Sequence, residues 1–397
     1  MRHPRNQSIA LAFVFAIVLN VNALDARAEE SLRPKRDTKN AEKQFPSLNA
    51  RNFANLLRQA QQGDRRAQTR VGVAFAKGDI ARKNPVEAVR WFSTAADGGD
   101  PHAQHDLAMM LYLGVGVERN LPLAAKWFEA AAGAGVPQAQ FRAGTMYGNG
   151  EGVLKNYGKA LALLRQAAGQ GLAAAQNNLG KMYRSGEGVT RDDLVAMRWF
   201  AMSAEQGDAV GEFDLGVMYW SGTAGPKDLA KALYWFQRSA NRGYAEAERV
   251  LGWWYRDGIG VTKDFQAARI WLLKAAQQGN ADSQNKLGLL YEQGQGVTAD
   301  SGRAVDWFAK AAEQGDGHAQ ANLAAIYQSG SGVPRDLIQA YKWYRLSRQN
   351  GGLDRSDQLR ELTNVMTADE IAESERLVTE WQPHQWSSPV DEGDLLE

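Results

Sequence analysis

The feature that most constrains this chain is an internal repeat of 36 residues. Written in rows of 36 from Ala67, the sequence places the same residue types in the same columns in eight successive rows, without insertion or deletion. Counting the row start as zero, glycine fills positions 11 and 32 of every row and alanine fills position 21. Tryptophan fills position 24 in seven rows, and Leu163 replaces it in the third. A period of this length indicates a stack of equivalent units.

Each row predicts two helices. The first carries Ala, Leu, a small residue and Tyr at positions 0, 4, 5 and 8, as in Ala175, Leu179, Gly180 and Tyr183. We expect the small residue where a neighbouring backbone comes close, and the position 11 glycine in the left-handed turn that ends the helix. Asn or Asp at position 17 is predicted to help cap the second helix.

The second helix follows the pattern Ala, Trp, aromatic, Ala, Ala and ends at the position 32 glycine. A single helix pair has one apolar face and nothing in its own row to bury it, so the pairs must stack. The predicted fold is an all-α, right-handed α/α solenoid of eight helix-pair repeats.

The ends of the stack require capping helices. We expect one over 51–66, since Gly63 lies 36 residues before Gly99, and others over 353–384, where "TADE" from Thr367 to Glu370 forms a capping box. In chain order, the sequence predicts a signal peptide over 1–28, a disordered charged leader over 29–50, the N-terminal cap over 51–66, the repeats over 67–352, the C-terminal caps over 353–384 and an acidic disordered tail over 385–397.

The first 28 residues predict export. Arg2 and Arg5 precede the uncharged run 9–19, and "ARA" ends at Ala28, after which we expect cleavage. The run is too short to span a bilayer comfortably and no other segment approaches it, so we do not expect an integral membrane protein. The absence of cysteine excludes a lipid-modified cysteine, disulfides and thiolate chemistry. A cysteine-free exported chain fits a bacterial periplasm or exterior.

The sequence predicts no catalytic, cofactor or metal site. A net charge of +1 argues against a nucleic-acid-binding surface spread over the molecule. Glycine pairs such as Gly186 and Gly188 follow a helix, whereas a phosphate-binding loop follows a strand and opens a helix. His102 and His105 have helical spacing, but two ligands do not make a metal site. No nucleophile and base stand at positions that the repeat marks as special.

The blocks "LGKMYRSGEGV" from Leu179 and "AAKWFEAAAGAG" from Ala124 resemble the Sel1-like repeat family, which is related to tetratricopeptide repeats. The resemblance covers Ala67 to Gly351. It implies an adaptor or scaffold, and bacterial members of the family are often periplasmic or secreted, with ties to envelope signalling, polysaccharide export or host contact. Some relatives have been proposed to hydrolyse cell-wall material or β-lactams, but the cysteines that staple those relatives are absent here.

The adjacent aromatic residues Tyr219 and Trp220 are predicted to have different roles, one in the fold and the other in binding. Adjacent helical side chains point about 100° apart, so one core pocket cannot hold both. Tyr219 stands at position 8, where most rows have tyrosine, whereas Trp220 stands at position 9, where the residue type changes from row to row. Positions 2, 6 and 9 share one side of the first helix, which we call the variable stripe and expect on a concave surface. The predicted partner-binding residues on it are Met109, Tyr112, Phe141, Phe213, Val217, Trp220, Arg249, Trp253 and Arg256.

Three functions are compatible with these observations. The first is a non-catalytic adaptor that holds a partner protein along the variable stripe. The second is a cell-wall or polysaccharide-binding protein, because exposed tryptophans also stack on sugar rings. The third is the cell-wall or β-lactam hydrolase that the family resemblance raises, for which no acid, base or nucleophile is arranged.

Overall fold

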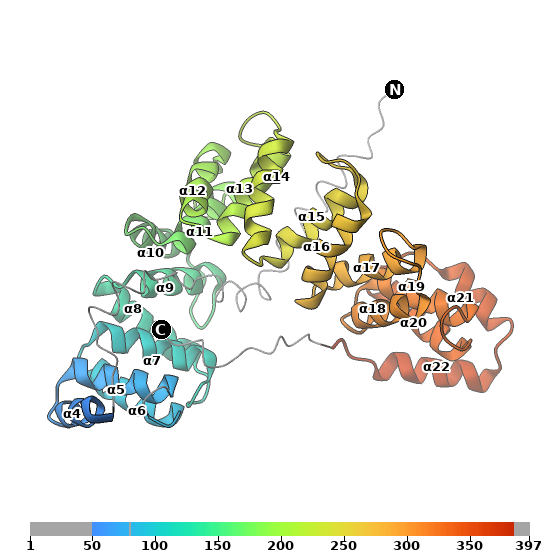
Figure 1. The fold of residues 1–397 in the computed structure, drawn as a ribbon. Helices are drawn as coiled ribbons and strands as arrows, with labels where there is room; N and C mark the ends of the chain where they lie inside the picture. Colours follow the sequence, from blue (N-terminus) through green and yellow to red (C-terminus); the bar gives the residue numbers. More distant parts are fainter. Residues whose placement is uncertain (1–49, 79–80, 385–397) are drawn as a thin grey trace. The chain divides into compact units, whose positions relative to one another are not determined.

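The structure, a computed structural model, describes residues 50–78 and 81–384, and these residues form helices joined by short turns (Figure 1). The predicted signal peptide, the predicted leader up to residue 49 and the predicted tail over 385–397 lie outside the described residues. No helix in the described ranges combines the length and apolar character needed to cross a membrane.

Each repeat contributes two helices of 13 residues. The first helices are α5 (Arg65–Lys77), α7 (Pro101–Leu113), α9 (Pro137–Asn149), α11 (Ala173–Ser185), α13 (Ala209–Ser221), α15 (Ala245–Asp257), α17 (Ala281–Gln293) and α19 (Gly317–Ser329). The second helices are α6 (Pro85–Asp97), α8 (Leu121–Gly133), α10 (Tyr157–Gly169), α12 (Asp193–Glu205), α14 (Leu229–Asn241), α16 (Phe265–Gln277), α18 (Ser301–Glu313) and α20 (Leu337–Gln349). The flanking helices are α4 (Ala50–Gln61), α21 (Ser356–Thr363) and α22 (Ala368–Glu380).

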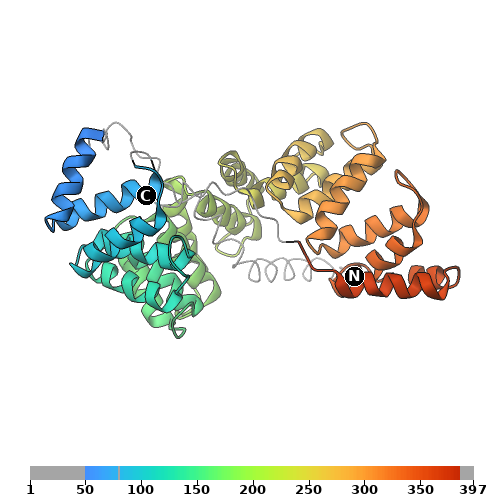
Figure 2. The same cartoon turned by 90° about the horizontal axis from the view of Figure 1, so that it is seen from below.

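The repeats fall into two compact units, one ending at Asp214 and the other beginning at Leu215, within α13. In the first unit second helices pack on the first helix of the next repeat, as α6 does on α7, α8 on α9 and α10 on α11. Figure 2 shows the helices of this unit in blue to green. In the second unit α14 packs on α15, α16 on α17 and α18 on α19 in the same way. This stacking confirms the predicted all-α solenoid of helix pairs.

Local sequence signals end and begin the helices as predicted. The eight glycines that follow the first helices, from Gly78 to Gly330, have φ between +65° and +81°, a region that a residue with a Cβ rarely adopts. The Asn or Asp before each second helix, from Asn84 to Asp336, accepts a hydrogen bond from the backbone N–H three residues later.

The small residue at position 5 has a different reason from the one predicted. A Cβ on Gly180 would lie 2.5 Å from the ring of Phe200, and one on Gly72 would lie 2.7 Å from the ring of Phe92. The neighbour that comes close is therefore a side chain of the second helix and not a backbone. Phe92 and Phe200 are fully buried, so the ring seated on the glycine forms the centre of its repeat.

The C-terminal end of the second unit is covered by α22, which packs on α20. The helix begins at the predicted capping box, in which Thr367 and Glu370 exchange hydrogen bonds with each other's backbone N–H. The Tyr341 hydroxyl donates a 2.7 Å hydrogen bond to Glu375, and the rings of Trp343 and Trp381 meet edge to face at 6.5 Å. These contacts give the last repeat the cover that the next repeat gives to the others.

Gly211 occupies a row start where the first four rows have alanine, and Ser203 lies close to the place that an alanine Cβ would take here. A Cβ on Gly211 would lie 2.7 Å from Ser203 Cβ and closer still to its Oγ. The three rows before it have alanine at both equivalent positions, as at Ala95 and Ala103. Ser203 is held in place because its hydroxyl donates a 2.9 Å hydrogen bond to Asp208, whose Oδ2 also accepts the Gly211 N–H at 2.7 Å.

Replacing Gly211 with alanine should therefore destabilise the protein by about 2 kcal/mol, because the added methyl group overpacks the contact with Ser203. This sign is opposite to the usual gain from removing a helical glycine. Adding Ser203→Ala, which restores the alanine pair of the earlier rows, should recover most of the loss. Urea denaturation of the single and double variants measures both effects.

The matched control is Gly169→Ala near the end of α10, where an added Cβ meets nothing within 4 Å. This variant should be as stable as the parent protein or more so. Equal free energies of unfolding for Gly211→Ala and Gly169→Ala would contradict the packing explanation.

Candidate partner-binding face

The nine predicted partner-binding residues divide between the two units. Met109, Tyr112, Phe141 and Phe213 belong to the first unit, and Val217, Trp220, Arg249, Trp253 and Arg256 belong to the second.

In the first unit the predicted aromatic surface is largely interior, which corrects the expectation of an exposed stripe there. Met109, Phe141 and Phe213 are 6%, 9% and 6% exposed. Phe141 joins the apolar cluster that includes Leu179 and Met182 of the next repeat, so the neighbouring helix covers it. Tyr112 is half-buried and its hydroxyl donates a 2.9 Å hydrogen bond to Glu151. Met109, Tyr112 and Phe141 therefore take part in packing between adjacent repeats.

In the second unit Trp220 and Trp253 form an aromatic pair on the variable stripe. Their ring centroids are 5.9 Å apart with an interplanar angle of 86°, an edge-to-face arrangement that aromatic rings favour. Both side chains are half-buried. The pair lies on consecutive first helices, α13 and α15, and therefore joins two repeats.

The side chains around Trp253 hold it in a defined orientation. Asp257 accepts hydrogen bonds from Arg256 Nε at 2.7 Å and Arg256 Nη2 at 2.9 Å, and it also accepts one from Trp253. The Arg256 hydrogen bonds, with help from Trp253, hold the pKa of Asp257 below its usual value. The carboxylate therefore stays charged and anchors both neighbours at physiological pH.

The scaffold role predicted for the position 8 tyrosines is confirmed by their contacts. The Tyr183 hydroxyl accepts a 2.7 Å hydrogen bond from Arg165, and the Tyr255 hydroxyl accepts one of 3.4 Å from Gln237, in each case from the second helix of the preceding repeat. Lys231, from the second helix of the same repeat, places its ammonium group 5.2 Å from the centre of the Tyr219 ring. Tyr219 thus belongs to the column that ties helices together.

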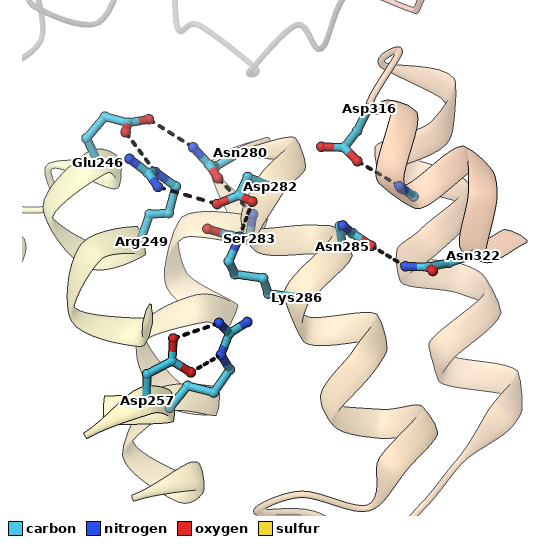
Figure 3. Close-up of polar contacts among 12 residues, drawn as sticks. Glu246, Arg249, Asp257, Asn280, Asp282, Ser283, Asn285, Lys286, Asp316 and Asn322 are labelled. Carbon is cyan, nitrogen blue, oxygen red and sulfur yellow. Dashed lines mark hydrogen bonds and ion pairs between the residues drawn. The ribbon is translucent and has the colours of Figure 1, made fainter. Parts of the chain in front are cut away.

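Arg249 lies in a cluster of ionic contacts between α15 and α17 (Figure 3). Its side chain is 12% exposed and contacts Glu246 at 2.8 Å and Asp282 at 3.4 Å. Asp282 also pairs with Lys286, and Asn280 donates a 3.0 Å hydrogen bond to Glu246. Burial acts to raise the pKa of Asp282, but the charges of Lys286 and Arg249 outweigh it and lower that pKa. The charges of Arg249 are matched within the cluster, which joins two first helices.

Amide side chains join the next pair of first helices in a similar way. Asn322 on α19 donates a 2.9 Å hydrogen bond to the buried Asn285 on α17 (Figure 3). In the first unit, Asn177 on α11 donates a 2.9 Å hydrogen bond to Asp214. Variable residues on the first helices thus also set how successive repeats are joined.

A hollow of about 220 Å³ lies beside Arg256, between the C-terminal ends of α15 and α17. It is lined by Arg256, Asp257, Lys263, Phe265, Leu289 and Gln293, among others. Its lining combines an aromatic and an aliphatic side chain with charged groups. Such a hollow can accept one side chain of a partner.

A recurring polar column was missed by the sequence analysis. Position 1 of the rows, here called the glutamine column, holds Gln68, Gln104, Gln140, Gln176, Glu212, Glu248, Gln284 and Gln320. Each of the six glutamines donates a hydrogen bond of 3.0 to 3.3 Å to a backbone carbonyl eight residues earlier, at the end of the preceding second helix. The regular spacing of glutamine in the rows is the signal that could have revealed this column.

The described residues hold no group of three His, Cys, Asp or Glu side chains that could bind a metal ion. His105 Nδ1 lies 3.1 Å from Asp106 Oδ1, and the His105 ring meets the buried Phe128 ring edge to face at 5.7 Å. His105 is thus engaged in packing within its own repeat.

Comparison with known proteins agrees with this architecture. The family model described as the Sel1 repeat matches eight times in succession, over residues 65–100, 101–136, 137–172, 173–208, 209–244, 245–280, 281–316 and 317–352. No curated protein matches the chain.

Solved structures include similar proteins. A Sel1 repeat protein from Oxalobacter formigenes is 33% identical, with a TM-score of 0.61 over 78% of this chain and 90% of that one. A protective antigen present in uropathogenic Escherichia coli strains is 27% identical, with a TM-score of 0.53 over 84% of this chain and 87% of that one. With eight contiguous family matches and the helix pairs they predict, the chain belongs to the Sel1 repeat family.

Proposed function

We propose that this protein is a non-catalytic, exported adaptor that binds a partner protein through the variable stripe of its second unit. Sel1 repeat proteins generally mediate protein–protein interaction. The observation that carries the proposal here is the edge-to-face pair of Trp220 and Trp253, which stands in columns that the scaffold leaves variable.

The physical properties of this pair suit a binding centre. Tryptophan is enriched among residues that contribute most to binding energy, because it offers a large contact area and loses little side-chain entropy. The contacts of Trp253 with Trp220 and Asp257 restrict its rotation before any partner arrives, which reduces the entropic cost of association. The hollow beside Arg256 provides an adjacent place for a partner side chain.

The proposed face is narrower than the stripe predicted from the sequence. It comprises Val217, Trp220, Trp253 and Arg256, while Arg249 contributes through the ionic cluster that joins α15 to α17. Met109, Phe141 and Phe213 are left out because their side chains are buried.

Glycan binding is the alternative that the same tryptophans support, since indole rings also stack on sugar rings. The two ligand classes are distinguished by treating the target with protease or with cell-wall hydrolases before capture. The hydrolase function considered from the family resemblance is not part of our proposal.

Export to the periplasm or beyond rests on the first 28 residues. Their basic start, short uncharged run and small-residue site before Glu29 are the features of a cleavable secretory signal. The absence of cysteine from the chain is compatible with an oxidising compartment.

We expect the double variant Trp220→Ala, Trp253→Ala to lose capture of its partner. The mature protein, residues 29–397, is immobilised and exposed to envelope extract and culture medium, and it should retain a partner protein. The variant should retain about tenfold less of that partner or even less, the loss expected when two central binding residues are removed. Quantitative mass spectrometry of the captured material measures the ratio.

The matched control is Tyr234→Ala on α14, an aromatic residue that is 53% exposed and lies on a second helix. It should capture the partner as well as the parent protein does. Equal capture by all three proteins would place the binding site elsewhere, and capture that survives protease but not cell-wall hydrolases would favour the glycan alternative.

We also expect the exported protein to begin at Glu29. N-terminal sequencing of protein recovered from the periplasm or medium of a bacterial host expressing the whole chain tests this. Replacing Ala26 and Ala28 with bulky residues should block cleavage, because the signal peptidase site requires small side chains. Recovery of the uncleaved parent chain in the cytoplasm would contradict export.

A further inference from the structure

The glutamine column contains two acids, Glu212 and Glu248, in the fifth and sixth repeats. Both side chains are in the interior, 0% and 3% exposed. Glutamine and glutamic acid have nearly the same shape, but glutamine always offers an N–H donor, whereas the acid offers a donor only when it is protonated. The column therefore places amide and carboxyl side chains in equivalent positions of the same molecule.

The glutamines define what the position requires. Gln284 donates a 3.0 Å hydrogen bond to the Ala276 carbonyl and accepts one of 2.7 Å from Gln314, which follows the next second helix. The position thus needs one donor toward a carbonyl and one acceptor toward an amide. Gln140 and Gln176 follow the same pattern.

Glu248 keeps the acceptor half of this pattern. Its Oε2 accepts a 2.8 Å hydrogen bond from Gln278, whose amide also donates to the Gly243 carbonyl at 3.0 Å. The carbonyl eight residues before Glu248 belongs to Ala240, at the end of α14. A carboxylate has no proton to offer to that carbonyl, and its negative charge would be repelled by the partial negative charge of the carbonyl oxygen.

We propose that Glu248 is a buried proton-binding site that joins the fifth and sixth repeats, with the protonated acid donating to the Ala240 carbonyl as glutamine does in the other repeats. When the proton leaves, the donor is lost and a buried negative charge remains, so the packing of α15 on α14 and α16 weakens. The ligand of this site is a proton, and the site makes the joint sensitive to pH.

The charged groups on the surrounding helices do not remove this sensitivity. Lys274 on α16 attracts the carboxylate, but burial raises the pKa of Glu248 to about 7 despite it. On α15 itself, Glu246 and Arg249 are engaged with each other and with Asp282 of α17. On α14, Arg238 places its guanidinium 4.9 Å from the centre of the Trp235 ring.

The direction in which stability changes with pH follows from the pKa of Glu248 in the folded and unfolded protein. A glutamic acid with a pKa of about 7 in the folded protein and 4.5 otherwise holds its proton longer when folded. The carboxyl therefore imposes no penalty below about pH 4.5, a growing one between pH 4.5 and 7, and its full penalty above pH 7. Stability should fall as the pH rises through this window.

The test compares the full chain with Glu248→Gln at pH 5 and pH 8. Because six other repeats have glutamine at this position, the variant should fold. Its melting temperature should be higher than that of the parent protein, and this difference should be about 5 °C larger at pH 8 than at pH 5. Hydrogen exchange of the amides at the start of α15 should slow in the variant at pH 8 and change little at pH 5. Glu205→Gln, at an exposed site on α12, should shift neither measurement.

The opposite substitution, glutamine to glutamic acid, should create the same pH dependence in another repeat. Gln284→Glu places an acid in the equivalent position of the seventh repeat and should introduce a new loss of melting temperature at pH 8 relative to pH 5. A carboxyl ¹³C NMR titration, with Glu248 identified by its absence in Glu248→Gln, should show a titration near neutral pH. The proposal is overturned if the variants differ from the parent equally at both pH values, or if Glu248 titrates in the ordinary range of exposed glutamates.

Discussion

The architecture depends on one contact made within each repeat, in which a large side chain of the second helix rests on a small residue of the first. Phe200 against Gly180 and Phe308 against Gly288 are examples, where the ring lies so close that even a methyl group would collide. The contact sets the distance and angle between the two helices of a pair. Since the pairs then have the same shape, each presents the same apolar face to the next repeat, and the stack can continue.

Contacts between repeats are of a different kind, and the polar ones vary along the chain. Alanines and the buried aromatic ring supply the apolar part of each joint, and the glutamine column supplies a recurring hydrogen bond. Between first helices the joints differ, with an ionic cluster between α15 and α17 and an amide pair between α17 and α19. The stability of a solenoid is approximately a sum over such neighbours, so each joint can be tuned by itself. Glu248 tunes its joint through a proton.

The proposed binding pair and the proton site lie on the same helix. Trp253 is half-buried on α15, whereas Glu248, five residues earlier, is buried. The two belong to different columns of the repeat and serve different neighbours. A substitution in one column therefore changes a surface, whereas a substitution in the other changes a joint.

The sequence by itself determined the repeat and the residues that end one helix and begin the next, because these depend on interactions within a few residues. A glycine with positive φ ends a helix, and the side chain of Asn84 or Asp336 caps the next one, without help from distant parts of the chain. The separation of Tyr219 from Trp220 could likewise be predicted, because columns that keep their residue type report shared packing.

Only the tertiary structure decided which residues of the variable stripe are open. Met109 and Trp253 have equivalent positions in their rows, yet one is buried and the other is half-exposed, because burial depends on the side chains that the neighbouring repeat happens to present. The matched charges around Arg249 and the carbonyl that faces the glutamine column also arise between repeats, at distances that the row pattern does not encode. A repeat specifies how its own helices pair, but its exposed chemistry is settled by contacts with its neighbours.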